Sequence, residues 1–347
     1  MTSILLMAGA KVTGYALKPP TDPSLFCLLG FDKYDNEASD TEKAYPGTLT
    51  NVYADIRDLD TLKKTFEQAQ PEIVIHMAAQ PLVRASYEDP VGTYATNVMG
   101  TVNVLECCRL TDGIRSIINV TTDKVYRNLE RSEGYREDEQ LCGYDPYANS
   151  KSCSELVTHS YLNSFFKDKG IPVTTMRAGN VIGGGDFARD RIIPDCVRAA
   201  IKGEDIIVRN PYSVRPYQHV LEPVVGYLRV AAGQYNDPQT EGCYNIGPDD
   251  EDAKTTGDIA SLFCKCWNTL NINSSGKIDW VNRSDGGPHE DKYLKLDCTK
   301  IKETLDWHPV WNIEKAIEEL VIWYGAYAKG EDLTAITKQQ IREYLSY

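Results

Sequence analysis

Tyr147 and Lys151 stand four residues apart at the start of a segment with helical pattern, so their side chains share one face of a helix. An ammonium group held beside a phenol favours the phenolate, and we expect the pKa of Tyr147 to lie below its ordinary value of about 10. Such a tyrosine can take a proton from a hydroxyl group. Because the chain contains 21 tyrosines, the spacing alone also fits a packed phenol and a lysine that reaches to solvent.

A second polar group, Thr122-Asp123-Lys124, closes an apolar run ahead of this segment. A hydroxyl at the end of a strand can hydrogen-bond a reacting alcohol, and an adjacent carboxylic acid can protonate a leaving hydroxide, a contribution of about 10²–10⁴ in rate. Taken alone, Asp-Lys after a strand is also typical of a solvated turn. Together with Tyr147 and Lys151, the group predicts oxidation of a sugar alcohol followed by loss of water beside the new ketone.

The segments that must position these residues alternate between β and helical patterns. The predicted strands are Lys11–Ala16, 72–77, Ser116–Val120 and 173–176, and the predicted helices are 59–70, 91–110 and 147–169. This alternation predicts an α/β fold with a doubly wound, Rossmann-like parallel sheet that is covered on both faces.

After Asn180 the alternation stops, with three consecutive glycines at 183–185 and several prolines. We therefore expect a dinucleotide-binding domain over residues 1–180. Residues 181–347 should form mainly a smaller, mixed substrate-binding lobe, with some segments returning to the first domain. Ligands bind at the carboxyl ends of parallel strands, so residues 78–80, 121–124 and 178–180 should meet at one cleft.

Composition excludes several classes of function. The 347 residues carry a formal charge of −13, which disfavours a nucleic-acid partner or an anionic membrane surface. The ten cysteines show no regular framework and are interpreted as reduced thiols, and neither they nor the histidines have metal-ligand spacing. No stretch has the length of a membrane span. We expect a cytoplasmic protein without a metal.

Two further groups of charged residues allow more than one interpretation. Arg189, Arg191, Arg209 and Arg215 form a local basic excess that suits a diphosphate, although a solvated face with ion pairs is the alternative. Residues 55–58 (DIRD) follow a short apolar segment, where a loop could meet an adenine ring. A helix N-cap by Asp55 or Asp58 fits equally well.

Several longer motifs resemble the nucleotide-sugar 4,6-dehydratases of the extended short-chain dehydrogenase/reductase family. They are residues 14–20 (GYALKPP), 76–84 (HMAAQPLVR), 122–126 (TDKVY), 177–186 (RAGNVIGGGD) and 215–223 (RPYQHVLEP). Family members that act on dTDP-glucose have Asp-Glu where this chain has Asp123-Lys124. The lysine points to the branch that acts on CDP-glucose.

The resemblance implies a role for each matching position. Tyr147 would remove the C4 hydroxyl proton while hydride passes to bound NAD, Thr122 would steady the oxygen, and Lys151 would hold the nicotinamide ribose. Asp123 would protonate the leaving C6 hydroxyl, and Lys124 would assist loss of the C5 proton. The remaining implied contacts are Asp55, Ile56, Ala78, Ala79 and Gln80 to NAD, and Asn180, Arg191, Arg215, Asn245 and His289 to the nucleotide sugar.

The resemblance also implies a homodimer through residues 91–110 and 147–169. One departure concerns the first strand of the family and its glycine-rich turn at the cofactor pyrophosphate, which this sequence does not contain. Residues 1–10 instead resemble the last turns of the first helix. Two explanations fit this departure: a gene model that is shortened at its start, and a chain that has lost its binding site for the dinucleotide. We expect the 347-residue form to retain NAD weakly and to have low stability.

Two alternative functions stay open at this point. One is another nucleotide-sugar 4,6-dehydratase or an epimerase. The other is a catalytically silent protein that binds NAD or a nucleotide sugar, for which the missing glycine turn is the best argument. The intact set of Thr122, Asp123, Tyr147 and Lys151 favours an enzyme, because a binding protein does not need it.

Overall fold

The fold is centred on a parallel four-stranded sheet. The computed structural model describes residues 1–37, 44–272, 276–283 and 293–347. In this sheet the strands lie in the order β10 (Cys243–Ile246), β5 (Val173–Ala178), β4 (Ser116–Val120) and β3 (Ile73–His76), and every pair is parallel. The order β5-β4-β3 with helical crossovers is that of a wound α/β sheet. The predicted α/β class is confirmed.

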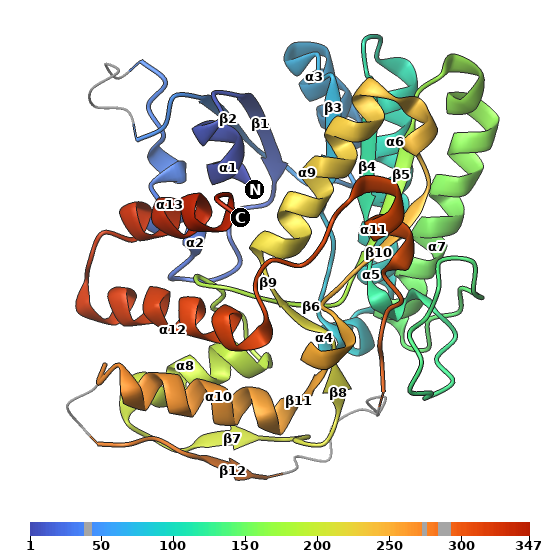
Figure 1. Cartoon of the computed structure of the whole chain (residues 1–347). Coiled ribbons are helices and arrows are strands. Elements are labelled where there is room, and N and C mark those ends of the chain that lie inside the picture. The colour runs from blue at the N-terminus through green and yellow to red at the C-terminus, as the bar shows by residue number, and fades with distance from the viewer. Residues whose placement is uncertain (38–43, 273–275, 284–292) are drawn as a thin grey trace.

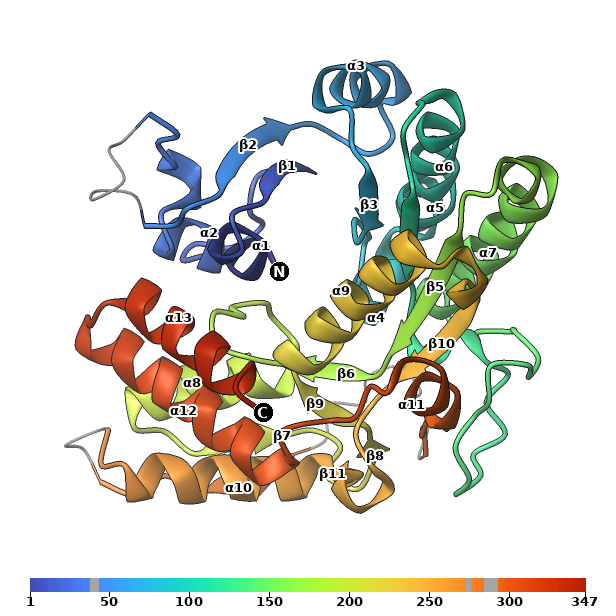
Figure 2. The ribbon, with the colours of Figure 1, turned by 45° about the horizontal axis from the view of Figure 1, so that its top comes forward.

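A second parallel sheet contains only β1 (Lys11–Ala16) and β2 (Thr48–Tyr53). Figures 1 and 2 show this pair beyond β3, with α3 (Leu59–Ala69) leading from β2 back to β3. Among the described residues, no strand pairs with the edge of β1 that is turned away from β2. The four predicted strands are therefore divided between two parallel sheets, not joined in one.

Helices cover both faces of the four-stranded sheet, as predicted (Figure 2). Successive side chains of a strand point to opposite faces, and β4 shows this directly. Ile117 packs in a core cluster with α3, α6 (Gly100–Leu110) and the end of the α7 region. Ile118 packs in another with α9 (Leu221–Asn236) and α11 (Thr299–Leu305). The sheet that carries the predicted chemistry is thus held from both sides.

The two long predicted helices are interrupted by π turns. The first consists of α5 (Pro90–Tyr94), a π turn η2 (Ala95–Met99) and α6, and the second of α7 (Pro146–Tyr161) followed by a π turn η4 (Leu162–Phe166). Both start with an aspartate N-cap and a proline in the first turn, and Asp145 accepts a hydrogen bond from the Ala148 amide at 2.9 Å. This cap fixes where α7 begins, one residue before Tyr147.

The C-terminal part forms a mixed lobe of short strands and helices. Its two-stranded sheets pair β6 (Asn180–Ile182) with β9 (Tyr217–His219), β7 (Ile206–Val208) with β12 (Trp280–Asn282), and β8 (Val214–Arg215) with β11 (Lys254–Thr255). Its helices are α8 (Ile192–Lys202), α10 (Thr256–Thr269), α12 (Ile313–Lys329) and α13 (Leu333–Tyr344). By contrast, β10 leaves this lobe and extends the first sheet.

One hydrophobic cluster joins this lobe to the N-terminal elements. This cluster contains Leu6 of α1 (Thr2–Met7), Phe31 of a 3-10 turn and Leu49 of β2. They are buried together with residues of α8, α10 and α12. The β1–β2 sheet therefore packs on the C-terminal lobe. None of the helices among the described residues combines the length and apolar character that a membrane crossing requires.

Candidate active site

The predicted catalytic residues come together where β4 ends beside α7. The chain leaves β4 through Thr121 and Thr122 and enters a short 3-10 turn, η3 (Asp123–Val125), which contacts α7. Thr122, Asp123, Tyr147 and Lys151 are all buried, with side chains less than one tenth exposed. Two segments separated in the sequence thus place a hydroxyl, a carboxylate, a phenol and an amine around one point.

Asp123 lies at the centre of this group. Its Oδ1 accepts hydrogen bonds from Thr122 Oγ1 at 2.9 Å and from Lys124 Nζ at 3.1 Å. Its Oδ2 is buried and has no hydrogen-bond partner among the described residues. Leaving a buried carboxylate oxygen without a partner costs free energy, and such groups in native structures commonly mark a functional position.

Tyr147 contacts the same group through Thr122, whose hydroxyl hydrogen-bonds the phenol. Burial raises the pKa of Tyr147 to about 12, and the nearby Asp123 adds to this, whereas Thr122 and Arg191 lower it. The expectation of a pKa below the ordinary value is therefore wrong for the ligand-free protein. Desolvation of the phenolate outweighs the favourable charges.

Lys151 is directed to the backbone of β4. Its Nζ donates to the Val120 carbonyl oxygen at 2.9 Å. Burial lowers the pKa of Lys151 to about 8, and the carboxylate of Glu155 opposes that shift. The ammonium group is thus held at the carboxyl end of β4, one helical turn from Tyr147.

The loop after β3 is fixed by Asn97, a residue that the sequence argument did not identify. Asn97 Oδ1 accepts from the Gln80 amide at 2.8 Å, and its Nδ2 donates to the Gln80 carbonyl at 3.0 Å and to Ser150 Oγ at 2.9 Å. Asn97 lies in the π turn η2, a feature that often occurs at functional sites. It connects the predicted cofactor loop, Ala78 to Gln80, with the helix that carries Tyr147 and Lys151.

Asn180 and Arg191, two of the predicted substrate residues, lie near the catalytic group. Asn180 Oδ1 accepts a hydrogen bond from Lys124 Nζ at 3.4 Å. Arg191 is near enough to lower the pKa of Tyr147, and its Nη1 lies 3.6 Å from Asp186 Oδ2.

Other predicted contacts are less favoured by the geometry. Arg215 is buried on β8, and its Nη1 donates to the Val214 carbonyl at 2.9 Å. Asn245 is fully buried, where its amide donates to the Tyr135 and Asp297 carbonyls and accepts from Tyr126. Because these core hydrogen bonds occupy the side-chain amide of Asn245, its contact with a substrate stays a prediction. His289 lies outside the described residues.

The predicted adenine contacts, Asp55 and Ile56, occupy different environments. Asp55 forms an ion pair with Arg57, with Oδ2 at 2.6 Å from Nη2. Ile56 is 8% exposed, and its side chain packs so closely on Gly100 of α6 that a Cβ atom there would lie 2.7 Å from Ile56 Cγ2. The N-cap of α3 is Asp58, which accepts from the Thr61 amide. A cofactor contact by Asp55 or Ile56 stays a prediction.

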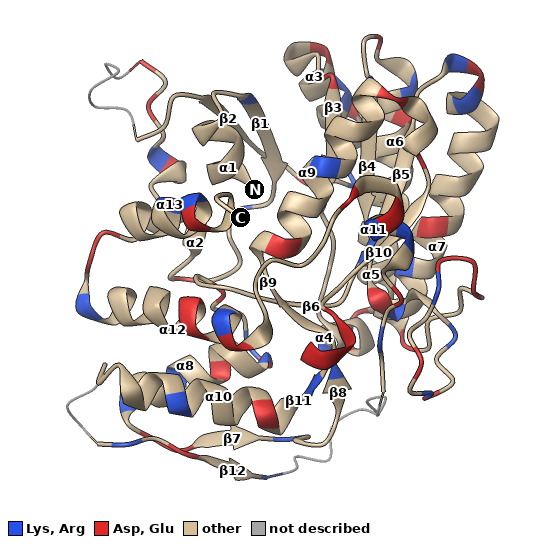
Figure 3. Cartoon of the chain, viewed as in Figure 1, with Lys and Arg blue, Asp and Glu red and all other residues tan. Residues whose placement is uncertain are grey.

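The basic excess of the sequence is largely offset by neighbouring carboxylates. Arg209 Nη1 lies 2.6 Å from Asp190 and its Nη2 lies 2.9 Å from Asp195, which also pairs with Arg198. Figure 3 shows acidic and basic residues interspersed over the visible face, not gathered by sign. The ion-paired interpretation therefore holds for Arg209, and Arg191 also lies near a carboxylate, that of Asp186.

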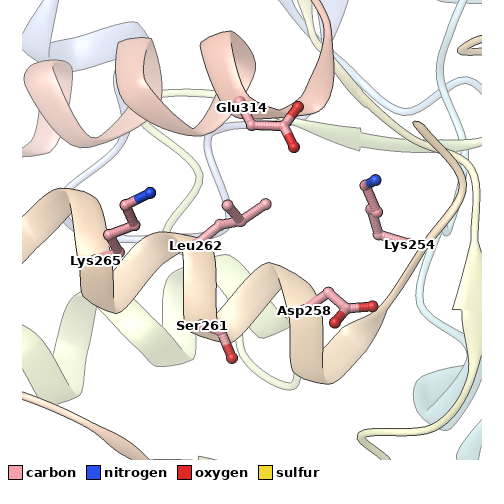
Figure 4. Close-up of a pocket in the computed structure, with 6 residues that line it drawn as sticks. All are labelled: Lys254, Asp258, Ser261, Leu262, Lys265 and Glu314. Carbon is pink, nitrogen blue, oxygen red and sulfur yellow. The ribbon is translucent and has the colours of Figure 1, made fainter. Parts of the chain in front are cut away.

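A pocket elsewhere in the C-terminal lobe lies between α10 and α12 (Figure 4). It is lined by Lys254, Asp258, Ser261, Leu262, Lys265 and Glu314. Two ammonium groups and two carboxylates offset one another there, and none of the predicted site residues takes part. The chemistry is therefore assigned to the end of β4 and not to this pocket.

Comparisons with known proteins identify similar sequences and similar folds. The chain is 44% identical over 345 residues to the CDP-glucose 4,6-dehydratase of Salmonella typhimurium strain LT2, covering 97% of this chain and 90% of that protein. Its fold is similar to the crystal structure of UDP-glucuronic acid 4-epimerase from Bacillus cereus, with TM-score 0.74, 20% identity and coverage of 94% and 95% of the two chains.

A dTDP-glucose 4,6-dehydratase from Streptomyces venezuelae has TM-score 0.67 and 24% identity, with 82% of each chain covered. At these identities the two structural matches establish the fold. The family described as GDP-mannose 4,6 dehydratase matches residues 27–320, which include β4, the η3 turn, α7 and most of the mixed lobe. On the strength of that match and the 44% identity over nearly its whole length, this chain belongs to the GDP-mannose 4,6-dehydratase family.

Proposed function

We propose that this protein dehydrates CDP-glucose to CDP-4-keto-6-deoxyglucose with bound NAD. The observation that carries the proposal is the buried Asp123 carboxylate, with one oxygen held by Thr122 and Lys124 and the other without a partner in the part of the chain that the structure describes. A carboxyl group so arranged can present a proton to a leaving hydroxyl group. The Salmonella relative, at 44% identity, supports CDP-glucose as the substrate.

Each side chain then has a separate task. Tyr147 accepts the proton of the C4 hydroxyl, and Thr122 hydrogen-bonds the same oxygen. The resulting 4-ketone acidifies the C5 hydrogen. Transfer of a proton from the Lys124 ammonium to Asp123, which it hydrogen-bonds, would leave a neutral amine to remove the C5 hydrogen and a carboxylic acid to protonate the C6 hydroxyl, so that the C5–C6 double bond forms and water leaves. Since general acids and bases must reach the transferring proton within hydrogen-bond distance, the burial of Thr122, Asp123 and Tyr147 beside the partly exposed Lys124 supports this assignment.

The cofactor would lie along the carboxyl ends of β3 and β4. When bound, NAD supplies a positively charged ring that accepts hydride from C4 and returns it to C6. The phenol of Tyr147, the ammonium of Lys151 and the backbone of Ala78 to Gln80 form a donor set that fits a nicotinamide ribose. Lys151 is held by Val120 and Gln80 by Asn97, so the set is fixed before a ligand binds.

Incubation of the NAD-loaded protein with CDP-, dTDP-, UDP- and GDP-glucose tests this function. We expect CDP-glucose to give a 4-keto-6-deoxy product, detected by its absorbance in base and by mass, with the largest kcat/KM of the four. A larger kcat/KM for another nucleotide would transfer the assignment to that dehydratase. Interconversion of epimers without loss of water would identify an epimerase, and binding without turnover would identify the silent protein.

We further propose that two copies associate through α5, α6 and α7. These helices lie side by side in both views (Figures 1 and 2). They expose large apolar side chains, with Val91 79%, Met99 53% and Leu156 59% accessible. An exposed apolar surface over neighbouring helices is typical of an interface between subunits.

Leu156→Glu is expected to convert the dimer to a monomer, because a buried carboxylate without a partner would oppose association. Light scattering after size exclusion measures the change. Leu345→Glu is the matched control, since Leu345 is 53% exposed on the C-terminal segment. A monomeric parent, or a Leu156→Glu variant that remains dimeric, would contradict the proposed interface.

The cytoplasm is the proposed location. All ten cysteines are free thiols in the structure, and cysteines usually stay reduced in that compartment.

A further inference from the structure

Glu155 is a buried carboxylate on the same face of α7 as Lys151, one helical turn further along. Its side chain is 4% exposed. Oε1 accepts from Thr121 Oγ1 at 2.5 Å, and Oε2 accepts from Thr175 Oγ1 at 2.7 Å. Glu155 therefore ties α7 both to the end of β4 and to β5.

Arg177 of β5 completes this arrangement from the other side. Its Nε and Nη2 donate to the two oxygens of Glu155, both at 2.9 Å, and the Arg177 side chain is only 3% exposed. Nη1 donates to Tyr126 Oη at 2.8 Å and to the Glu137 carbonyl at 3.0 Å. A fork-like pairing of this kind fixes the orientation of both partners.

The contacts of Lys151 and Glu155 fall on consecutive residues, the last residue of β4 and the one that follows it. Lys151 donates to the Val120 carbonyl, and Glu155 accepts from Thr121. The next two residues are Thr122 and Asp123, which supply the hydroxyl and carboxyl groups of the site. The register between α7 and the end of β4 is thus set by charged side chains immediately behind the reacting groups.

The charge environment of Lys151 depends on few groups. Among the described residues, the titratable side chains that face this part of α7 come from several elements: Tyr147 and Glu155 on α7 itself, His76 on β3, Asp123, Lys124 and Tyr126 at η3, Arg177 on β5, Arg191 at the start of α8 and Tyr227 on α9. Burial lowers the pKa of His76 to about 3, so this histidine is neutral at physiological pH. Glu155 is the negative group that acts on Lys151.

We infer that Glu155, clamped by Arg177, is a positioning residue that aligns α7, and with it Lys151, with the end of β4. It does not touch the substrate. Its effect on turnover passes through Lys151 and Tyr147, so the catalytic part of the inference rests on the proposed function. The alignment of α7 with the end of β4 by Glu155 does not depend on the proposed function.

The test is the titration of Lys151, followed by the NMR signal of ¹³Cε-labelled lysine in the purified full-length chain without ligands. The signal is assigned by its loss in Lys151→Arg. In the double variant Glu155→Gln/Arg177→Met, the Lys151 midpoint should move about one pH unit toward acid, because the neighbouring opposite charge is gone. Removing both partners avoids an unpaired buried charge, which would unfold the protein.

Two controls separate positioning from general stability. Arg177→Lys retains the charge pair and should leave the Lys151 midpoint in place. Glu319→Gln removes one of the acidic partners of Lys315, in a pair with the same four-residue spacing on α12, and should change only the Lys315 signal. A double variant with the parental Lys151 midpoint, whatever its melting temperature, would overturn the inference.

Turnover provides the second readout. In the double variant we expect the alkaline limb of kcat to move by the same one pH unit, with the KM for the nucleotide sugar nearly unchanged. A parent protein that shows no turnover would refute the proposed function, while the ligand-free titration would still decide the role of Glu155. A large rise in KM with an unmoved limb would instead assign Glu155 to the substrate site.

Discussion

Tyr147→Phe is expected to lower kcat for the nucleotide sugar by about 10²–10⁴-fold, the contribution of a positioned general base. The change removes one oxygen and leaves the ring in its buried place beside Thr122. Binding of the nucleotide should be unchanged, because its diphosphate and base do not depend on the phenol. Steady-state kinetics with CDP-glucose and calorimetric titration with CDP measure the two effects separately.

Tyr144→Phe is the matched control for this change. Tyr144 lies three residues earlier and is 80% exposed, so the same substitution there should leave kcat at the parental value. Unchanged activity of Tyr147→Phe would exclude Tyr147 as the base. A parallel loss of CDP binding would show that the phenol serves the binding site instead.

Asp123→Asn is expected to reduce formation of the 4-keto-6-deoxy product by about 10²–10⁴-fold, because an amide cannot protonate the leaving hydroxyl. The asparagine keeps the shape of the residue and can still accept the bonds from Thr122 and Lys124. Oxidation at C4 precedes this step and uses Tyr147. CDP-glucose recovered from D₂O should therefore carry deuterium at C5 even though water is not eliminated.

Asp112→Asn, on an exposed loop, controls for loss of one negative charge and should behave like the parent. The exchange measurement distinguishes two roles for Asp123. If deuterium incorporation disappears together with the product, Asp123 acts at the first step, not in the elimination. If product formation persists at the parental rate, another group supplies the proton.

Local patterns were sufficient to predict the elements that carry the chemistry. Lys11–Ala16 and Ser116–Val120 have the same bounds in the structure as in the sequence prediction. The reason is physical, since apolar β-rich runs bounded by polar residues have few other stable conformations in an α/β protein. The meeting of Thr122 and Asp123 with Tyr147 follows from the rule that ligands bind at the carboxyl ends of parallel strands.

The environment of these groups could not be predicted in the same way. The spacing of Tyr147 and Lys151 predicted a phenol of lowered pKa, but burial raises it, and the depth of burial is a property of the packed structure. Asn245 shows the same limit, because its core hydrogen bonds come from residues more than 50 positions away. Glu155 and Asn97 could have been identified from the sequence, because each is a polar residue on a helical face that is otherwise buried.

The cluster that unites Leu6, Phe31 and Leu49 with α8, α10 and α12 means that cooperative units in this protein do not follow the order of the chain. The N-terminal strand pair shares its apolar interior with the C-terminal lobe, whereas η3 and α7, which carry Asp123 and Tyr147, pack in other clusters. Damage to the first fifty residues would thus disturb the C-terminal lobe before it reached α7.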